Sequence, residues 1–193
     1  SGIGLATAKS LATKGYTIVA LGRNAAKGEK AIKEIGSAGG DKTHKFYVVD
    51  LSSQESIKVV CERLQNDYAQ VKVLVNNAAT LFSTYKESVD GVEMQWAVNH
   101  LGYYLMTMGL LPLLKASENA RIVNVASSAH LKATMHWDDP ELKSDYNITQ
   151  AYGQSKLANV MFTRALAKRL KPLNICVFAA HPGLVKTKLG SKK

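Results

Sequence analysis

The sequence predicts a doubly wound α/β domain, in which helices cover both faces of a parallel sheet, and three observations lead to this fold class. Short apolar runs alternate along the chain with segments of helical periodicity. The apolar runs have no polar face, which is typical of strands buried on both sides in a parallel sheet. No repeat, linker or low-complexity tract divides the chain, so residues 1–193 are expected to form a single domain.

The first half of the chain supplies two strands and three helices. A helix over 5–14 is expected to end at Gly15, because glycine suits the left-handed conformation that closes helices. Ser52 or Ser53 is expected to open the third helix as its N-cap. The other segments are a strand at 16–22, a charged helix at 24–35 that ends in the glycines of 36–40, a strand at 45–50 and the third helix at 53–69.

The second half of the chain adds three strands and two helices. They are a strand at 71–78, a long helix at 92–115 with Pro112 near its end, a strand at 121–127, a helix at 151–170 and a last strand at 174–181. The connection over 130–150 has no regular pattern and is longer than most connections in compact domains. Loops of that length are often functional.

The net charge of +10 and the isoelectric point near 9.6 raise the question of a nucleic-acid partner. The basic residues are spread along the chain, and only two small groups occur, at 168–171 and 186–193. Neither group is interleaved with aromatic residues that would stack on bases. We therefore expect no nucleic-acid partner, because a phosphorylated small molecule or an anionic membrane surface explains the charge equally well.

The cysteines and histidines indicate neither a disulfide framework nor a metal site. Cys61 and Cys176 are the only cysteines, which favours a reducing compartment. The five histidines show no spacing typical of metal ligands, so no metal is expected. No apolar run reaches the length of a membrane span.

Ligands bind to a doubly wound sheet at the carboxyl ends of its strands, and chemically suited residues stand there. Gly2 and Gly4 would let the backbone approach a pyrophosphate at the start of a helix. The other residues at strand ends are Arg23, Asp50, the asparagines of 76–79, Ser127 with Ser128, and the segment 181–187. Each of these also has a plainer interpretation, as a tight turn, a solvated charge, a turn former or a helix cap.

Tyr152 and Lys156 stand four residues apart at the start of the helix that leads into the last strand. At this spacing both side chains lie on one face of the helix. An ammonium beside a phenol lowers the pKa of the phenol and suits it to proton transfer near neutral pH. Tyr68 and Lys72 have the same spacing, but they precede the amino end of a strand, on the wrong side of the sheet for a ligand.

Taken in order, these motifs resemble the short-chain dehydrogenase/reductase family over nearly the whole chain. SGIG (1–4) resembles the end of the family's glycine-rich cofactor loop, DL (50–51) its adenine-contacting motif, NNAA (76–79) its NNAG motif and HPGLVKT (181–187) the stretch that holds the nicotinamide. The segments AYGQSKLAN, NHLGYY and SSAH are similar in detail to the retinol dehydrogenase and WW-domain oxidoreductase branch. The resemblance implies a Rossmann-type sheet and an oxidoreductase that interconverts a carbonyl and an alcohol.

The resemblance also implies a catalytic tetrad of Asn99, Ser127, Tyr152 and Lys156. Tyr152 would give a proton to the carbonyl oxygen, and Lys156 would lower the pKa of Tyr152 and hold the nicotinamide ribose. Ser127 would hydrogen-bond the substrate oxygen, and it is preferred to Ser128 because it lies three residues after Asn124, as in the family's NxxS pattern. Asn99 would hold a water that relays protons.

The expected cofactor is NADP(H). Proteins that select NAD usually carry an acid after the second strand of the fold, where a carboxylate binds the ribose hydroxyls. This chain has Arg23 and Asn24 at that point, and a guanidinium can pair with a 2′-phosphate. The residues expected to contact the cofactor are Ser1, Gly2, Ile3, Gly4, Arg23, Asn24, Asp50, Leu51, Asn77, Ala78, Tyr152, Lys156, Pro182, Gly183, Val185 and Thr187.

Three departures from the family pattern carry expectations of their own. Ala79 replaces the last glycine of NNAG, a change that is expected to be tolerated. The first glycine of the cofactor loop is absent together with the strand before it, and the chain stops soon after 181–187, so we expect part of a longer protein. The strands at 16–22 and 71–78 should then flank a gap where the first strand is missing.

Substrate and setting are less narrowly defined. Met135, Trp137 and Tyr146 in the long loop suggest an apolar or aromatic carbonyl compound, such as a retinoid or a steroid. The resemblance points to an intracellular protein, cytoplasmic or associated with the endoplasmic reticulum, and leaves room for membrane association through a missing terminal segment and for homo-oligomers. The alternatives are a regulator that binds NADP and turns over weakly, a basic nucleic-acid-binding module and a nucleotide-sugar epimerase.

Overall fold

The structure, a computed structural model, describes residues 2–39, 43–183 and 185. Ser1 and Thr187, both expected to contact a cofactor, lie outside these residues. In the first half the elements follow the expected order, with strands shorter than the apolar runs. They are α1 (Gly2–Ala12), β1 (Val19–Gly22), α2 (Ala25–Gly36), β2 (Lys45–Val48), α3 (Gln54–Asp67) and β3 (Val73–Asn76).

In the second half the expected long helix over 92–115 is divided. Its parts are α4 (Met94–Trp96), a π-helical turn η1 (Ala97–Leu101), α5 (Gly102–Gly109) and α6 (Leu111–Lys115). Pro112 explains the last break, because it has no N–H to donate to the preceding turn. The remaining elements are β4 (Arg121–Val125), the 3₁₀ turn η2 (Ser128–Lys132), α7 (Ile148–Leu170), the 3₁₀ turn η3 (Lys171–Leu173) and β5 (Cys176–Ala180).

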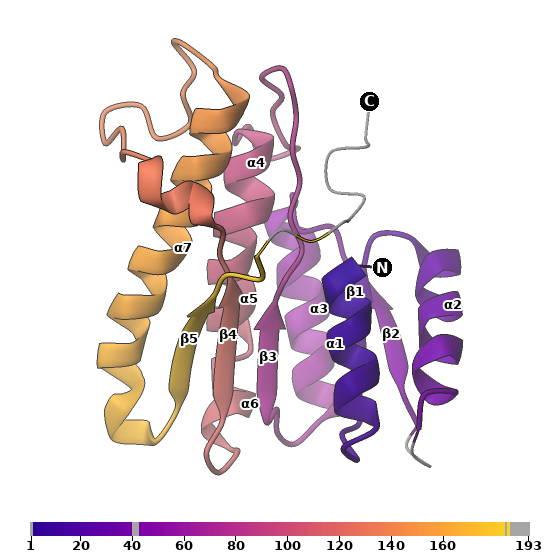
Figure 1. Cartoon of the computed structure of the whole chain (residues 1–193). Helices are drawn as coiled ribbons and strands as arrows, with labels where there is room; N and C mark the ends of the chain where they lie inside the picture. Colours follow the sequence, from indigo (N-terminus) through magenta and orange to yellow (C-terminus); the bar gives the residue numbers. More distant parts are fainter. Residues whose placement is uncertain (1, 40–42, 184, 186–193) are drawn as a thin grey trace.

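All strand pairs in the described residues are parallel, as the apolar runs predict. β1 pairs with β2, and β4 lies between β3 and β5. Within the part of the chain that the structure describes, β1 and β3 do not pair with each other. The predicted gap between the strands of 16–22 and 71–78 is therefore confirmed, and Figure 1 shows α1 standing in front of it.

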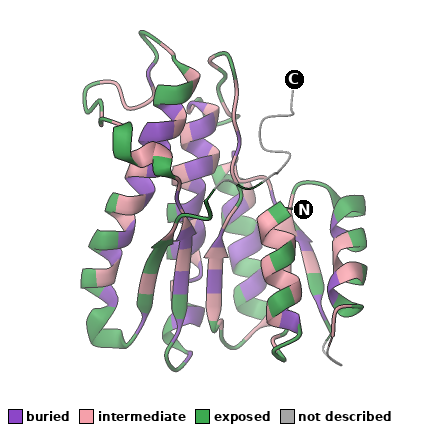
Figure 2. Cartoon of the chain, viewed as in Figure 1, coloured by how far each residue is buried: buried purple, intermediate pink, exposed green. Residues whose placement is uncertain are grey.

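The main core lies between the three-stranded sheet and the helices that cover it. Its buried side chains include Ile122 of β4, Leu114 of α6 and Leu166 of α7. A second, smaller cluster joins α1 and α2 through Ala12, Ile18 and Ile35. Figure 2 shows that β4, in the middle of its sheet, is more buried than the edge strand β5.

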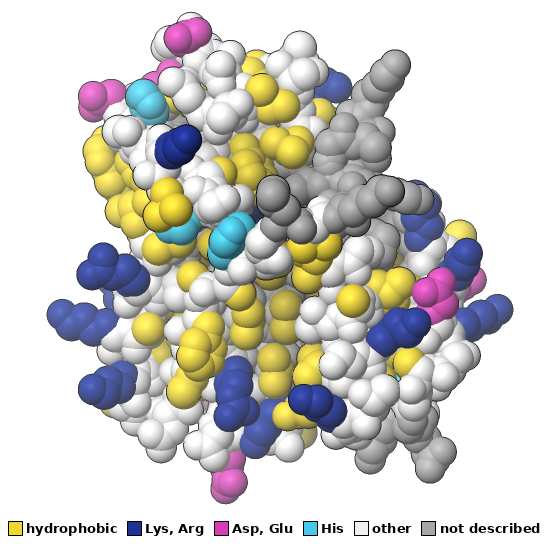
Figure 3. Space-filling model, viewed as in Figure 1, with side chains coloured by type: hydrophobic (Ala, Val, Ile, Leu, Met, Phe, Trp, Pro, Cys, Tyr) yellow, Lys and Arg dark blue, Asp and Glu magenta, His cyan; other side chains and the backbone are white. Residues whose placement is uncertain are grey.

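The surface view in Figure 3 places apolar side chains in the middle of one face, with Lys and Arg around its rim. On this face the basic residues do not gather into one patch, although the net charge is +10. Among the described residues, no helix is both long enough and apolar enough to cross a bilayer.

Candidate active site

A cleft of about 1690 Å³ opens at the carboxyl ends of the strands and continues into the gap between β1 and β3. The parallel topology brings this edge together, because every strand of the sheet ends on the same side. The expected site residues that line the cleft are Gly2, Ile3, Gly4, Arg23, Asn24, Asp50, Leu51, Asn77, Ala78, Ser127, Tyr152, Lys156, Pro182, Gly183 and Val185. Of the expected site residues that the structure describes, Asn99 alone does not line the cleft.

The glycines of the first helix have a specific geometric role. Gly2 adopts a left-handed φ of 57°, which favours glycine. At Gly4 an added Cβ would lie 2.8 Å from Nδ2 of Asn77, so a larger residue would require the Asn77 side chain to move. Gly2, Gly4 and the Asn77 side chain form a narrow cradle at the start of α1, which fits the pyrophosphate of a dinucleotide.

Arg23 and Asp50 face the same part of the cleft, after β1 and β2. Burial alone would raise the pKa of Asp50, but hydrogen bonds from Ser52 and the positive charge of Arg23 together lower it. Asp50 Oδ1 accepts hydrogen bonds from the backbone N and the hydroxyl of Ser52 at 3.0 and 2.7 Å. The carboxylate therefore shapes the turn before α3, whose N-cap is Ser53.

Asn24 lines the cleft, but its side chain is already engaged as a helix cap. Its Oδ1 accepts a hydrogen bond from the backbone N of Lys27 at 2.9 Å and opens α2. Lys27 also lines the cleft, although it is not among the residues expected there. Its place three residues after Asn24, in the first turn of α2, was the available signal. With Arg23 it puts two cations at this corner of the site.

Ser127, Tyr152 and Lys156 lie together in the cleft. Ser127 stands two residues after the end of β4, where its Oγ accepts from the backbone N of Ala129 at 3.3 Å and caps η2. Ser128 is exposed and does not line the cleft. Lys156 Nζ lies 5.7 Å from the centre of the Tyr152 ring and donates to the backbone O of Val125 at 3.0 Å.

Burial sets the protonation of the pair. It raises the pKa of Tyr152, an effect that interaction with the Ser127 hydroxyl partly offsets. It lowers the pKa of Lys156 from 10.5 to about 8. The expectation that Lys156, together with a bound oxidised nicotinamide, lowers the pKa of Tyr152 stays a prediction, and in the protein by itself burial is the largest influence on this pKa.

Asn99 is wholly buried in the π-helical turn η1 and holds backbone rather than facing the cleft. Its Oδ1 accepts from the backbone N of Thr80 at 2.8 Å, and its Nδ2 donates to the backbone O of Thr80 at 3.1 Å and to Ser155 Oγ at 3.3 Å. This arrangement ties the segment after β3 to α7. A π-turn in a helix often marks a functional site. The water-relay role expected for Asn99 stays a prediction.

The long loop contributes less to the cleft than its sequence suggested. Met135, Trp137 and Tyr146 are not among the residues that line it, and Trp137 is 70% exposed. The apolar substrate inferred from these three side chains therefore has no support from their placement. The described residues contain no group of three side chains suited to hold a metal.

The arrangement suits proton transfer at a ligand oxygen beside a bound dinucleotide. A phenol and a hydroxyl converge at one point of the cleft, a buried cation lies behind the phenol, and the glycine cradle and the cations of Arg23 and Lys27 lie further along. Because its pKa is about 8, Lys156 can accept and release protons near physiological pH.

Comparison with known sequences identifies similar proteins over the whole chain. A family model described as short chain dehydrogenase matches residues 1–193. Retinol dehydrogenase 12 of Bos taurus is 41% identical over 189 residues, and retinol dehydrogenase 14 of Mus musculus is 40% identical over 200 residues. Each match covers 98% of this chain and 60% of the relative, so the chain spans about 60% of the length of these curated relatives.

Solved structures show the same fold. A crystal structure of a protein from Mycobacterium Paratuberculosis matches with a TM-score of 0.83 and 34% identity, covering 99% of this chain and 68% of that one. The RhlG/NADP active-site complex of Pseudomonas aeruginosa matches with a TM-score of 0.77 and 27% identity, covering 97% of this chain and 71% of that one.

Proposed function

The chain belongs to the short chain dehydrogenase family, and from this premise we propose that the whole protein is an NADP(H)-dependent oxidoreductase that interconverts a carbonyl and an alcohol. The observation that carries the proposal is the convergence of Ser127, Tyr152 and Lys156 in one cleft with the glycine cradle of Gly4 and Asn77. Tyr68 and Lys72 also line the cleft, but Lys72 is exposed, whereas Lys156 is buried beside the Tyr152 ring.

The reaction divides the work among these side chains. The bound dinucleotide supplies hydride chemistry. The Ser127 hydroxyl donates a hydrogen bond to the substrate oxygen and fixes its position, and Tyr152 O–H gives that oxygen a proton during reduction and removes it during oxidation. Lys156 lies behind the phenol ring and stabilises the phenolate that remains when Tyr152 has given up its proton. Asn99 holds the segment after β3 in place through the backbone of Thr80.

The preference for NADP(H) over NAD(H) rests on charge. Arg23 follows β1, where an NAD-selecting protein would carry a carboxylate, and Lys27 in the first turn of α2 lines the same cleft. A 2′-phosphate placed between them would gain charge-assisted hydrogen bonds. The similarity to the RhlG/NADP complex supports the same choice.

For the substrate we propose an apolar or aromatic aldehyde or ketone of the retinoid or steroid type. The support is the similarity to two retinol dehydrogenases, one of which is 41% identical. The proposed partner is thus a small molecule. We also propose that the protein acts inside the cell, in the cytoplasm or at the endoplasmic reticulum. Membrane association and homo-oligomers are compatible with the proposal and are not needed for it.

The experiment that tests the proposal is a cofactor-oxidation screen of the whole protein. NADPH consumption is followed with a retinaldehyde-type aldehyde, a steroid ketone and a small aromatic aldehyde, with NADH in parallel. We expect turnover with NADPH and at least one apolar carbonyl. Binding of NADPH without turnover of any member of the panel would leave the site as a cofactor-binding regulator and overturn the enzymatic assignment.

A further inference from the structure

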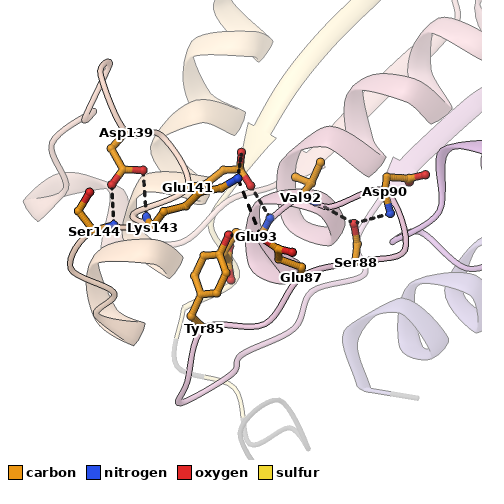
Figure 4. A network of polar contacts seen from close by, with 10 residues as sticks. All are labelled: Tyr85, Glu87, Ser88, Asp90, Val92, Glu93, Asp139, Glu141, Lys143 and Ser144. Carbon is orange, nitrogen blue, oxygen red and sulfur yellow. Dashed lines mark hydrogen bonds and ion pairs between the residues drawn. The ribbon is translucent and has the colours of Figure 1, made fainter.

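The long connection between η2 and α7, residues 133–147, is held by a network of hydrogen bonds and is not a free loop. We call these residues the substrate-side loop, because they lie between Ser127 and Tyr152 in the chain. Figure 4 shows part of the network, in which the loop meets the segment that leads from β3 to α4. Three contacts fix the loop, two to the helix that carries Asn99 and one to α7.

The first contact joins Tyr146 of the loop to Gln95 of α4. Tyr146 OH accepts a hydrogen bond from Gln95 Nε2 at 2.7 Å and donates one to the backbone O of Phe82 at 2.8 Å. Gln95 is fully buried, and its Oε1 has no hydrogen-bond partner among the described residues. Among the described residues, the hydrogen bond to Tyr146 is therefore the one bond of the Gln95 side chain. Removing it would leave a buried amide with no hydrogen bond to offset its lost hydration.

The second contact joins Glu141 of the loop to Glu93, just before α4. Glu141 Oε2 accepts from the backbone N of Glu93 at 2.6 Å. The Glu93 carboxylate, 1% exposed, accepts from the backbone N of Gln95 at 2.9 Å and of Trp96 at 2.7 Å, so it caps α4. Lys143 Nζ lies 3.7 Å from Glu141 at the exposed rim, where an ion pair adds little.

The third contact joins the loop to the helix of the Tyr–Lys pair. Gln154 lies on α7 between Tyr152 and Lys156 and is 1% exposed. Its Oε1 accepts from the backbone N of His136 at 2.7 Å, and its Nε2 donates to the backbone O of Pro140 at 2.6 Å. The loop is thus fixed at one end to the helix of Tyr152 and at the other end to the helix of Asn99.

We propose that Tyr146 and Gln95 form a positioning pair that holds the substrate-side loop in register with the helix carrying Asn99, so that this loop, which joins the segments of Ser127 and Tyr152 and lies just outside the lining of the cleft, is ordered before substrate arrives. Gln95 lies four residues before Asn99, and α4 runs directly into the π-turn of Asn99. A loop that is already in place avoids the cost of ordering it when substrate binds. Neither Gln95 nor Tyr146 lines the cleft, so the pair acts through the loop. The inference rests on the proposed function, since it assigns the loop to a substrate.

The test compares Tyr146→Phe with Tyr85→Phe in the whole protein. Tyr85 is a matched control, because its ring packs against Tyr146 at 5.8 Å while its hydroxyl donates to Glu87, two residues away on the same segment. We expect Tyr146→Phe to raise the KM of the carbonyl substrate about tenfold, the effect of losing one buried hydrogen bond. The KM of NADPH should be unchanged in both variants.

Hydrogen exchange of residues 133–147 gives a second readout that needs no turnover. Exchange should be faster by about tenfold in Tyr146→Phe than in Tyr85→Phe. The double variant Gln95→Leu/Tyr146→Phe should raise the substrate KM no more than the more harmful of the two single variants. Each single change already breaks the same hydrogen bond, so the second change has nothing further to remove.

The outcomes separate this inference from the proposed function. If no carbonyl is turned over by the unmodified protein, the proposed function fails, and exchange alone decides whether the pair holds the loop. Equal exchange rates in the two variants overturn the pairing. Faster exchange with an unchanged substrate KM in an active protein shows a purely structural bond and overturns the positioning role.

Discussion

Lys156 Nζ lies 5.3 Å from the centre of the Tyr103 ring and 5.7 Å from that of Tyr152, so the cation of this site is enclosed between two aromatic faces. Lys156 is 1% exposed, and its one hydrogen bond to the described residues goes to the backbone O of Val125. Two aromatic faces attract a cation, but they replace little of its hydration. The site thus keeps a charge where the fold would be more stable without it.

The first prediction is that Lys156→Met stabilises the protein without cofactor at pH 7 by about 2–3 kcal/mol while abolishing turnover. Burial lowers the pKa of Lys156 to about 8 from 10.5. Below pH 8 both folded and unfolded chains hold the proton, and the full cost of burying the charge is present. Between pH 8 and 10.5 the unfolded chain binds more protons, so the free energy of unfolding rises with pH.

Urea unfolding at pH 7 and at pH 10 measures both parts of this prediction. In the unmodified protein, the contribution of Lys156 should increase the free energy of unfolding as pH rises from 8 to 10, because the folded state releases the proton first. In Lys156→Met this contribution should be absent. Lys168→Met, an exposed lysine on the same helix, is the control. A Lys156→Met protein less stable than the unmodified one at pH 7 would contradict the argument.

The second prediction is that Tyr152→Phe keeps NADPH affinity and loses nearly all turnover. Only the hydroxyl moves a proton, while the glycine cradle and Lys156 remain. Fluorescence titration with NADPH and steady-state kinetics test the two halves separately. Tyr68→Phe is the control, because Tyr68 has a lysine four residues later but precedes the amino end of β3. Turnover within about tenfold of the unmodified protein, or 1.4 kcal/mol of barrier, would sink the assignment of Tyr152.

Much of the site could be predicted because parallel strands end at one edge. Once the apolar runs were assigned as strands, Arg23, Asp50, Asn77 and Ser127 had to lie on the same side of the fold, and they do. The resemblance to known motifs then distinguished Ser127 from Ser128. This part of the structure follows from strand direction alone.

The remaining features depend on tertiary contacts that spacing does not encode. The π-turn at 97–101 inserts one residue per turn into a helix whose apolar pattern reads as continuous. Gln95 and Gln154 look like ordinary helix residues, and only their burial against the loop shows what they hold. The raised pKa of Tyr152 likewise comes from burial, which a sequence pattern does not measure.

The third prediction concerns cofactor choice. Arg23→Ala should weaken the preference for NADPH over NADH by on the order of 1.5–3 kcal/mol, the usual value of a charge-assisted hydrogen bond. The ratio of kcat/KM for the two cofactors measures it. Lys30→Ala, a cation of α2 that does not line the cleft, should leave the ratio unchanged. Equal efficiency with both cofactors in the unmodified protein would refute the role of Arg23.

The last prediction concerns the gap between β1 and β3. Among the described residues each of these strands is paired on one side only, and the cleft extends between them along Val19 to Gly22 and Val73 to Asn76. Unpaired strand edges that face a cleft are templates for association with other chains, and the apolar side chains beside them lack the burial on which a typical stability of about 5–15 kcal/mol depends. Residues 1–193 expressed alone should therefore be insoluble, or show no cooperative thermal transition by near-ultraviolet circular dichroism. A sharp transition together with tight NADPH binding by this 193-residue chain would show that the glycine cradle of Gly2 and Gly4 is wrongly placed.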